Sequence, residues 1–126
     1  MQFDTVDHIA IIVSDYEKSK DFYVNKLGFR ILAEHVRPDK GDVKLDLEQH
    51  GCVLEIFSGA GHPERPSYPE ACGLRHLAFH VADVEAEAAA LRAIGIETEE
   101  IRIDPYTGAK MTFFRDPDGL PLELHG

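Results

Sequence analysis

Apolar and polar side chains alternate in the same way in two stretches of the chain, residues 6–13 and residues 74–81. In the first stretch Ile9, Ile11 and Val13 share one face, while His8 and Ala10 share the other. A period of two is typical of a strand with one face buried against a core. The pattern therefore predicts one such strand in each half of the chain.

A helix is expected after each of these strands. In the first half Ser14 and Asp15 are expected to open the helix, and Ser14 and Glu17 have the spacing of a capping box. Asp83 is the expected N-cap in the second half. Gly28 and Gly95 are expected to end the helices, because glycine readily adopts the left-handed conformation common at helix ends. Further strands are predicted over residues 29–36, 43–49, 52–57, 96–103, 110–115 and 120–125.

This order of elements predicts an α+β protein made of two tandem βαβββ modules. The first module covers about residues 1–58 and the second about residues 74–126, within a single domain of residues 1–126. Residues 59–73 contain three prolines and three glycines and are expected to form the linker. Two half-sheets related by a pseudo-twofold axis would form a curved mixed sheet with the helices on its outer face.

Four polar residues recur at equivalent positions in the two modules. A shift of 68 positions carries His8 onto His76 and Glu55 onto Glu123, so that each His–Glu pair has the same spacing of 47. The strand residues that alternate with these four are apolar and are expected to face the helices. The two His and two Glu side chains should then face the opposite side, where the two half-sheets would form a cleft.

Two imidazoles and two carboxylates suit one borderline divalent cation, with zinc or nickel favoured and cobalt, manganese or iron as alternatives. Calcium and magnesium prefer ligands that are all oxygen. Four protein ligands leave two positions of a six-coordinate ion open, as in a catalytic site. A ligand carboxylate near the metal can also act as a general base. A single His or Glu on a strand is more often structural, so this prediction depends on the matched spacings.

Composition narrows the possible functions. With 44% hydrophobic and 29% charged residues, the chain fits a globular protein better than a disordered one. Its net charge of -10, with no basic face, argues against a nucleic-acid partner. No membrane partner and a cytoplasmic location are expected, because there is no membrane-spanning apolar run and no secretory signal. Cys52 and Cys72 lack metal or redox spacing and are expected to be reduced thiols.

Other side chains are weaker candidates for the site. His80 and His125 share faces with His76 and Glu123, and each could support a ligand, touch substrate or simply face solvent. Arg75 is expected on the helix side, in a structural ion pair. One of the two neighbouring phenylalanines at 113 and 114 must face the cleft. Four further residues could contact an anionic substrate near the rim of the cleft, although exposure to solvent is the simpler interpretation. They are Arg102, Tyr106, Thr107 and Lys110.

The paired modules, the His–Glu–His–Glu spacing and the run Asp-Pro-Asp-Gly-Leu-Pro-Leu-Glu-Leu at residues 116–124 resemble the vicinal oxygen chelate superfamily, and glyoxalase I (lactoylglutathione lyase) within it. The resemblance covers nearly the whole chain and implies the glyoxalase/bleomycin resistance/dioxygenase fold. It implies His8, Glu55, His76 and Glu123 as metal ligands, Glu123 as the proton-shuttling base and Glu55 as its counterpart. The metal would stabilise an enediolate formed from a hemithioacetal. A homodimer is common in such proteins.

The expected function is a divalent-metal-dependent, glyoxalase-like lyase or isomerase acting on a small oxygenated substrate, of hemithioacetal or α-hydroxycarbonyl type. Glutathione as a partner is left open, because glyoxalase I has an arginine and an asparagine where this chain has Ile12 and Gly59. One alternative is another metalloenzyme of the superfamily, namely an epimerase, a dioxygenase or a thiol transferase, and Glu55 argues against these. The other alternative is a non-enzymatic small-molecule-binding protein, against which the four intact ligands argue.

Overall fold

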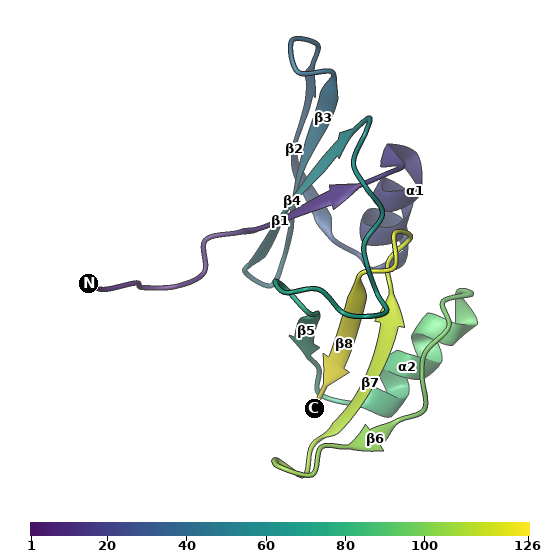
Figure 1. Ribbon diagram of the computed structural model, residues 1–126. Helices are drawn as coiled ribbons and strands as arrows, with labels where there is room; N and C mark the ends of the chain where they lie inside the picture. Colours follow the sequence, from purple (N-terminus) through teal and green to yellow (C-terminus); the bar gives the residue numbers. More distant parts are fainter. The chain divides into compact units, whose positions relative to one another are not determined.

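The computed structural model describes all 126 residues and divides them into two compact units, Met1–Pro63 and Glu64–Gly126. The division falls inside the predicted linker. Each unit has the order strand, helix and three strands, and each contains one mixed four-stranded sheet (Figure 1). The predicted α+β fold of two βαβββ modules is therefore confirmed. None of the helices has the length and hydrophobicity that crossing a bilayer requires.

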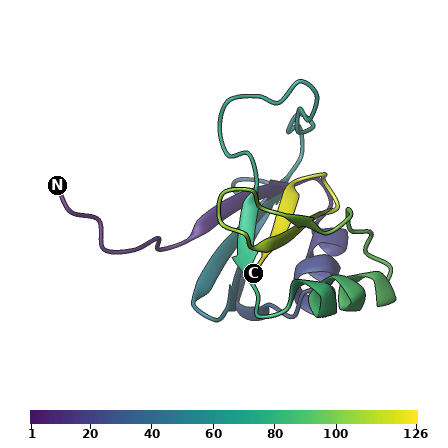
Figure 2. The same ribbon diagram turned by 90° about the horizontal axis from the view of Figure 1, so that it is seen from below.

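In the first unit the strands lie in the order β1-β4-β3-β2. β1 pairs in parallel with β4, and the other two pairings are antiparallel. The residues before β1 extend away from the sheet (Figure 2). The elements are β1 (Ile9–Val13), α1 (Tyr16–Lys20), the π-helix η1 (Asp21–Lys26), β2 (Arg30–Arg37), β3 (Asp42–Gln49) and β4 (Cys52–Gly59).

In the second unit the strand order is β5-β8-β7-β6, which is the same arrangement. β5 pairs in parallel with β8, and β8 and β6 each pair antiparallel with β7. The elements are β5 (Leu77–His80), α2 (Val84–Ala93), β6 (Arg102–Ile103), β7 (Lys110–Arg115) and β8 (Pro121–His125).

The register of the parallel strand pairs reproduces the repeat seen in the sequence. Ala10 lies opposite Glu55 in the β1–β4 pair, and Ala78 lies opposite Glu123 in the β5–β8 pair. Ala78 lies 68 positions after Ala10, and Glu123 lies 68 positions after Glu55. The numerical repeat in the chain is thus a repeat of strand pairing.

Each sheet buries one face against its own helix. In the first unit the fully buried apolar residues of β3 and β4 are Leu45, Leu47, Leu54 and Ile56. In the second unit α2 lies against β7 and β8 and buries Ala88 and Leu91, while Leu122 and Leu124 of β8 are also buried (Figure 2). Because side chains alternate along a strand, the glutamate between each pair of buried β4 or β8 residues faces away from the helix.

The first helix opens at one of the two expected residues but differs from the prediction in its cap and its form. Its N-cap is Asp15, whose side chain accepts a hydrogen bond from the Lys18 backbone N–H at 3.1 Å, so Ser14 is not the capping residue that the spacing to Glu17 predicted. After one α-helical turn the backbone widens into the π-helix, which buries Phe22 and Tyr23 side by side. The predicted glycine ends are confirmed, since φ is +80° at Gly28 and +82° at Gly95.

Three predicted strands are shorter than expected. β1 and β5 begin at Ile9 and Leu77, so His8 and His76 each lie one residue before a strand. For β5, the partner strand begins at Pro121, which has no N–H to extend the ladder. Only Arg102 and Ile103 form a strand in the predicted range 96–103. The rest of that range is tied to β7 by isolated bonds, such as Glu99 N–H to the Phe113 carbonyl at 2.8 Å.

Candidate metal and substrate site

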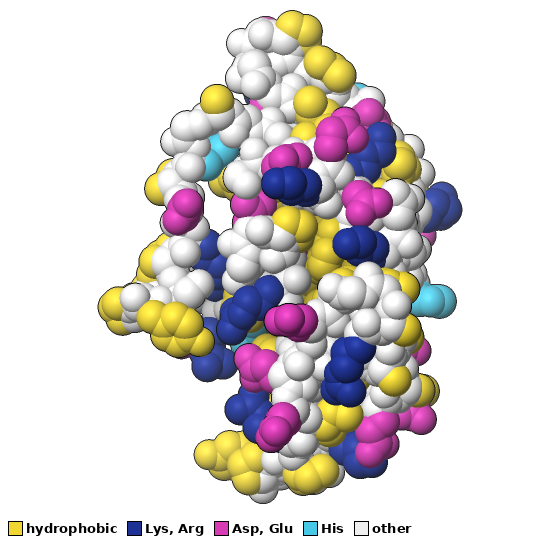
Figure 3. Space-filling model, turned by 90° about the vertical axis from the view of Figure 1, so that its right-hand side faces the viewer, with side chains coloured by type: hydrophobic (Ala, Val, Ile, Leu, Met, Phe, Trp, Pro, Cys, Tyr) yellow, Lys and Arg dark blue, Asp and Glu magenta, His cyan; other side chains and the backbone are white.

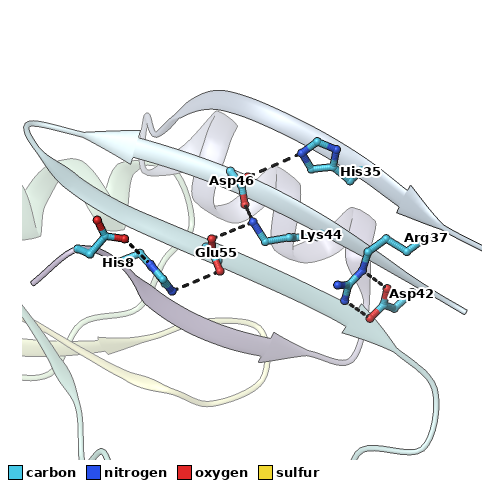
Figure 4. A network of polar contacts seen from close by, with 8 residues as sticks. His8, His35, Arg37, Asp42, Lys44, Asp46 and Glu55 are labelled. Carbon is cyan, nitrogen blue, oxygen red and sulfur yellow. Dashed lines mark hydrogen bonds and ion pairs between the residues drawn. The ribbon is translucent and has the colours of Figure 1, made fainter. Parts of the chain in front are cut away.

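In the first unit the structure brings His8 and Glu55 together, as predicted. Nε2 of His8 lies 3.4 Å from Oε2 of Glu55 (Figure 4). The other ring nitrogen, Nδ1, lies 2.7 Å from a carboxylate oxygen of Asp7. A carboxylate can only accept, so Nδ1 carries a hydrogen, and in the neutral form of the ring the lone pair is then on Nε2. The hydrogen bond to Asp7, and then the negative charge of Glu55, raise the pKa of His8 above its ordinary value.

Lys44 on β3 holds the second oxygen of Glu55. Its Nζ lies 2.8 Å from Oε1 of Glu55 and 2.6 Å from Oδ1 of Asp46 (Figure 4). The bonds to Asp46 and then to Glu55 raise the pKa of Lys44, so it remains a cation. The sequence analysis did not find this contact. The signal was available in β3, because its alternation places Lys44 and Asp46 on the face of the sheet that Glu55 occupies.

In the second unit His76 and Glu123 are brought together, also as predicted. Nε2 of His76 lies 2.9 Å from Oε2 of Glu123. The His76 ring makes an edge contact with Phe113, with ring centroids 5.2 Å apart. Phe113 stands opposite Glu123 in the sheet, where the first unit has Asp46 opposite Glu55. Phe114 is buried in the core, so Phe113 is the phenylalanine that faces the site.

The two glutamates therefore have different surroundings. The Glu123 side chain is 7% exposed and lies between an imidazole and an aromatic ring. The Glu55 side chain is 20% exposed and is bonded to a lysine. The lysine fixes the Glu55 carboxylate and balances its charge. The ion pairs of Glu123, in contrast, include no ammonium group.

Within each unit, the spacing of the two donor atoms suits two ligands of one divalent metal ion. With metal–ligand bonds of about 2.0–2.1 Å, two ligand atoms on one ion lie about 2.9 Å apart at a right angle and about 3.4 Å apart at a tetrahedral angle. The two Nε2–Oε2 distances, 2.9 and 3.4 Å, match this spacing. The Asp7–His8 bond is the type of contact that orients a histidine ligand. The structure gathers no group of three or more His, Cys, Asp or Glu side chains that could hold a metal, and each unit contains one of the two predicted His–Glu pairs.

Of the weaker candidate residues, two make contacts with carboxylates outside the His–Glu pairs. Nε2 of His125 lies 3.5 Å from a carboxylate oxygen of Asp104. His80 is exposed and lies opposite His125 in the sheet. Lys110 pairs with Glu85 at 2.7 Å. These contacts give His125 and Lys110 structural partners.

Arg75 was placed incorrectly on the helix side. It lines a pocket together with His76, because both residues precede β5, where strand alternation does not yet hold. The predicted structural ion pair does exist, between Nε of Arg75 and Glu70 at 3.0 Å. Arg102 lines the same pocket.

A family model described as the glyoxalase/bleomycin resistance protein/dioxygenase superfamily matches residues 5–124. The chain therefore belongs to this superfamily, as the resemblance of its motifs predicted.

Its similar proteins include several whose activity is not named. The uncharacterized protein YwkD of Bacillus subtilis (strain 168) is 55% identical over 126 residues, which cover 99% of this chain and 98% of that protein. The crystal structure of the glyoxalase family protein from Enterococcus faecalis shares 57% identity with a TM-score of 0.95 and covers 100% of both chains.

More distant relatives have names that span several chemistries. A 2-epi-5-epi-valiolone epimerase from Actinomyces sp. is 31% identical over 142 aligned positions, which cover 94% of this chain and 77% of that protein. Other relatives and structures of this fold are named as a catechol-2,3-dioxygenase, two probable lactoylglutathione lyases and a fosfomycin resistance protein. The superfamily thus includes lyases, epimerases, dioxygenases and resistance proteins.

Proposed function

We propose that this protein is a divalent-metal-dependent lyase or isomerase of glyoxalase type that acts on a small oxygenated substrate. In this proposal His8 and Glu55 from the first unit, and His76 and Glu123 from the second, bind one metal ion. The substrate would be a hemithioacetal or an α-hydroxycarbonyl compound.

One observation carries the proposal. Two equivalent strand pairs each present an imidazole Nε2 beside a carboxylate Oε2, at separations suited to two ligands of one ion. A structural role would explain either pair alone, since a His–Glu contact is an ordinary ion pair. It does not explain why the same pair recurs at the same register in both units.

A bound divalent metal would stabilise negative charge on a substrate oxygen. The residues of the chain would supply the rest of the chemistry. Glu123 is the proposed base, which removes a proton from one substrate carbon and returns it to the neighbouring carbon, because it is nearly buried and bonded to no ammonium group. Glu55 is its counterpart, and the bond from Lys44 holds its carboxylate in a fixed orientation.

The epimerase relative supports a second candidate. At 31% identity it is nearer to this chain than the relatives named as lactoylglutathione lyases, which are 28% identical. Epimerisation also needs a base beside an acidified C–H bond, so the same residues would serve it. The product distinguishes the two chemistries, because an epimerase returns the proton to the same carbon and a glyoxalase-type isomerase returns it to the neighbouring carbon.

The test combines metal analysis with an activity assay. The purified protein is loaded with nickel or with zinc, its metal content is measured, and the isomerisation of the glutathione–methylglyoxal hemithioacetal is followed. Metal at about one per chain with turnover supports the proposal. Metal without turnover rejects this substrate and directs the search to other thiols and to the epimerase assay. Absence of metal binding under all loading conditions contradicts the proposal.

We also infer a homodimer and a cytoplasmic location for this protein, as the resemblance and the composition suggest. Light scattering on the purified protein, at several concentrations and with or without metal, measures its mass. A constant mass of one chain would contradict the dimer.

A further inference from the structure

The second unit contains a pocket of about 210 Å³ next to His76. It is built from residues of this unit alone. The residues of its wall that matter for the argument are Arg65, Arg75, His76, Arg102, Phe113 and Arg115.

Positive charge is concentrated in this pocket. The chain has seven arginines and a net charge of -10, yet four of the seven line this one cavity. The acidic residues of the wall are only Glu70 and Glu99. On the face drawn in Figure 3, basic side chains lie among acidic ones. The wall therefore has two more positive than negative groups, which favours an anion.

The contacts of Arg65 show that one arginine organises the wall. It donates from Nη2 to the carbonyls of Leu74 and Arg75, at 2.8 and 2.9 Å. These bonds tie the loop before β5 to the backbone that leads into His76. Arg65 thus fixes the position of that segment while its charge still contributes to the pocket.

Arg102 and Arg115 keep donors for a ligand. Both contact Glu99, at 3.1 and 3.7 Å, so one carboxylate is shared by two guanidinium groups. A guanidinium has five N–H donors, and a single contact leaves most of them free. Arg102 also lies over the Phe113 ring, 5.7 Å from its centroid, which limits the orientations of its planar group.

The size and position of the pocket limit its ligand. A volume of about 210 Å³ is below the range of about 300–1,000 Å³ typical of sites for drug-sized molecules. The pocket borders His76, and Phe113 contacts both His76 and Arg102. A small molecule with its anionic end at the arginines would therefore have its other end beside His76.

We propose that this pocket binds the carboxylate or phosphate group of a small anionic substrate, with Arg102 and Arg115 as its direct donors. Guanidinium groups suit both anions, because their fork of N–H groups matches two oxygens. The assignment of the anion as part of the substrate rests on the proposed function. The binding of an anion in the pocket does not, because it needs no metal.

The test uses metal-free, full-length protein labelled with ¹⁵N, so that the result is independent of the metal site. Inorganic phosphate and glycolate are titrated separately, with ethylene glycol as the uncharged control, while the backbone and arginine Nε signals are followed. We expect saturable shifts at Arg102, Phe113 and Arg115 with at least one anion and none with ethylene glycol. The anion with the lower Kd identifies the preferred group. Absence of saturable shifts with both anions would overturn the proposal.

Substitutions of the pocket residues should change the affinity for the anion in opposite directions. Arg102→Gln and Arg115→Gln should each weaken anion binding by about tenfold, because each removes a charge-assisted contact. Glu99→Gln should tighten anion binding, because the substitution releases both guanidinium groups and removes a negative charge. Arg30→Gln is the matched control, since Arg30 is an exposed arginine paired with one glutamate in the other unit. Equal effects of the Arg30 and Arg102 substitutions would show that anion binding depends only on the net charge of the protein. This result would reject the pocket as the binding site.

Metal loading of a second portion of the same protein, followed by metal analysis, separates the two proposals. Anion binding in a protein that takes up no metal would leave the pocket standing and reject the proposed function. Metal binding in a protein that takes up neither anion would leave the function standing and reject the pocket.

Discussion

Nζ of Lys44 lies 2.8 Å from Oε1 of Glu55, the carboxylate oxygen that does not face His8. The equivalent glutamate of the second unit, Glu123, is paired with His76 and lies opposite Phe113 instead. Two glutamates that the repeat makes equivalent are thus given different surroundings. This difference is the basis for assigning them different roles.

Glu123→Gln should retain most of the metal binding and abolish proton transfer. The amide keeps an oxygen donor and nearly the same shape, but it cannot accept a proton at neutral pH. We expect the metal content to stay near that of the unchanged protein while kcat for the active substrate falls by a factor of about 10² or more. Asp118→Asn, in the turn before β8, is the control for a general effect of removing a carboxylate. Full activity in Glu123→Gln would remove the assignment of the base.

His76→Ala should lose the metal, because it removes one of the two imidazole donors. Elemental analysis after loading and dialysis measures the effect. His80→Ala is the matched control, since His80 lies four residues further along, at the end of β5, and is exposed. A His76→Ala protein that still binds stoichiometric metal would refute the ligand set.

Asp83→Ala should destabilise the second unit through its helix. The Asp83 side chain caps α2 by accepting a hydrogen bond from the Ala86 N–H at 3.0 Å. Loss of such a cap typically lowers the free energy of unfolding by about 1 kcal/mol. Thermal and denaturant unfolding measure this loss, with Asp83→Asn as the variant that keeps a capping oxygen. Equal losses in the Ala and Asn variants would argue that the cap is not the cause.

The ion pair of Arg37 and Asp42 should stabilise the first unit only above acidic pH. The two side chains are half-buried and meet through two hydrogen bonds, one of them 2.6 Å from Nε to Oδ1. The bonds from Arg37 lower the pKa of Asp42 below its ordinary value of 3.8. A lowered pKa in the folded state means that the stabilisation is present above the unfolded pKa and is lost as pH falls through the folded one.

The corresponding measurement is the melting temperature of Asp42→Asn at two pH values. At pH 7 the variant should melt below the unchanged protein. At a pH of about 2, below the pKa of an unfolded Asp, the difference should shrink. Asp39→Asn, in the same turn, controls for removing a negative charge. A difference that is as large in acid as at neutral pH would show that the ion pair is not its source.

Much of the fold was readable in the sequence because its signals are local or periodic. Alternation with a period of two indicated which face of β4 and β8 is buried, and therefore which way Glu55 and Glu123 point. The equal spacing of 47 predicted both His–Glu contacts, since equal spacing implies equal strand register. Gly28 and Gly95 marked the helix ends, because few other residues tolerate that backbone conformation.

Other features depend on contacts between residues far apart in the chain, and only the tertiary structure decided them. Lys44 could be placed on the polar face of β3 from its neighbours, but its bond to Glu55 depends on the pairing of β3 with β4. The arginine pocket combines a loop residue, Arg65, with Arg102 and Arg115 from the far end of the same unit. Local periodicity specifies the face of a strand on which a side chain lies. Which charged groups then meet is determined by how the strands and loops pack, and this packing is not encoded in any one segment.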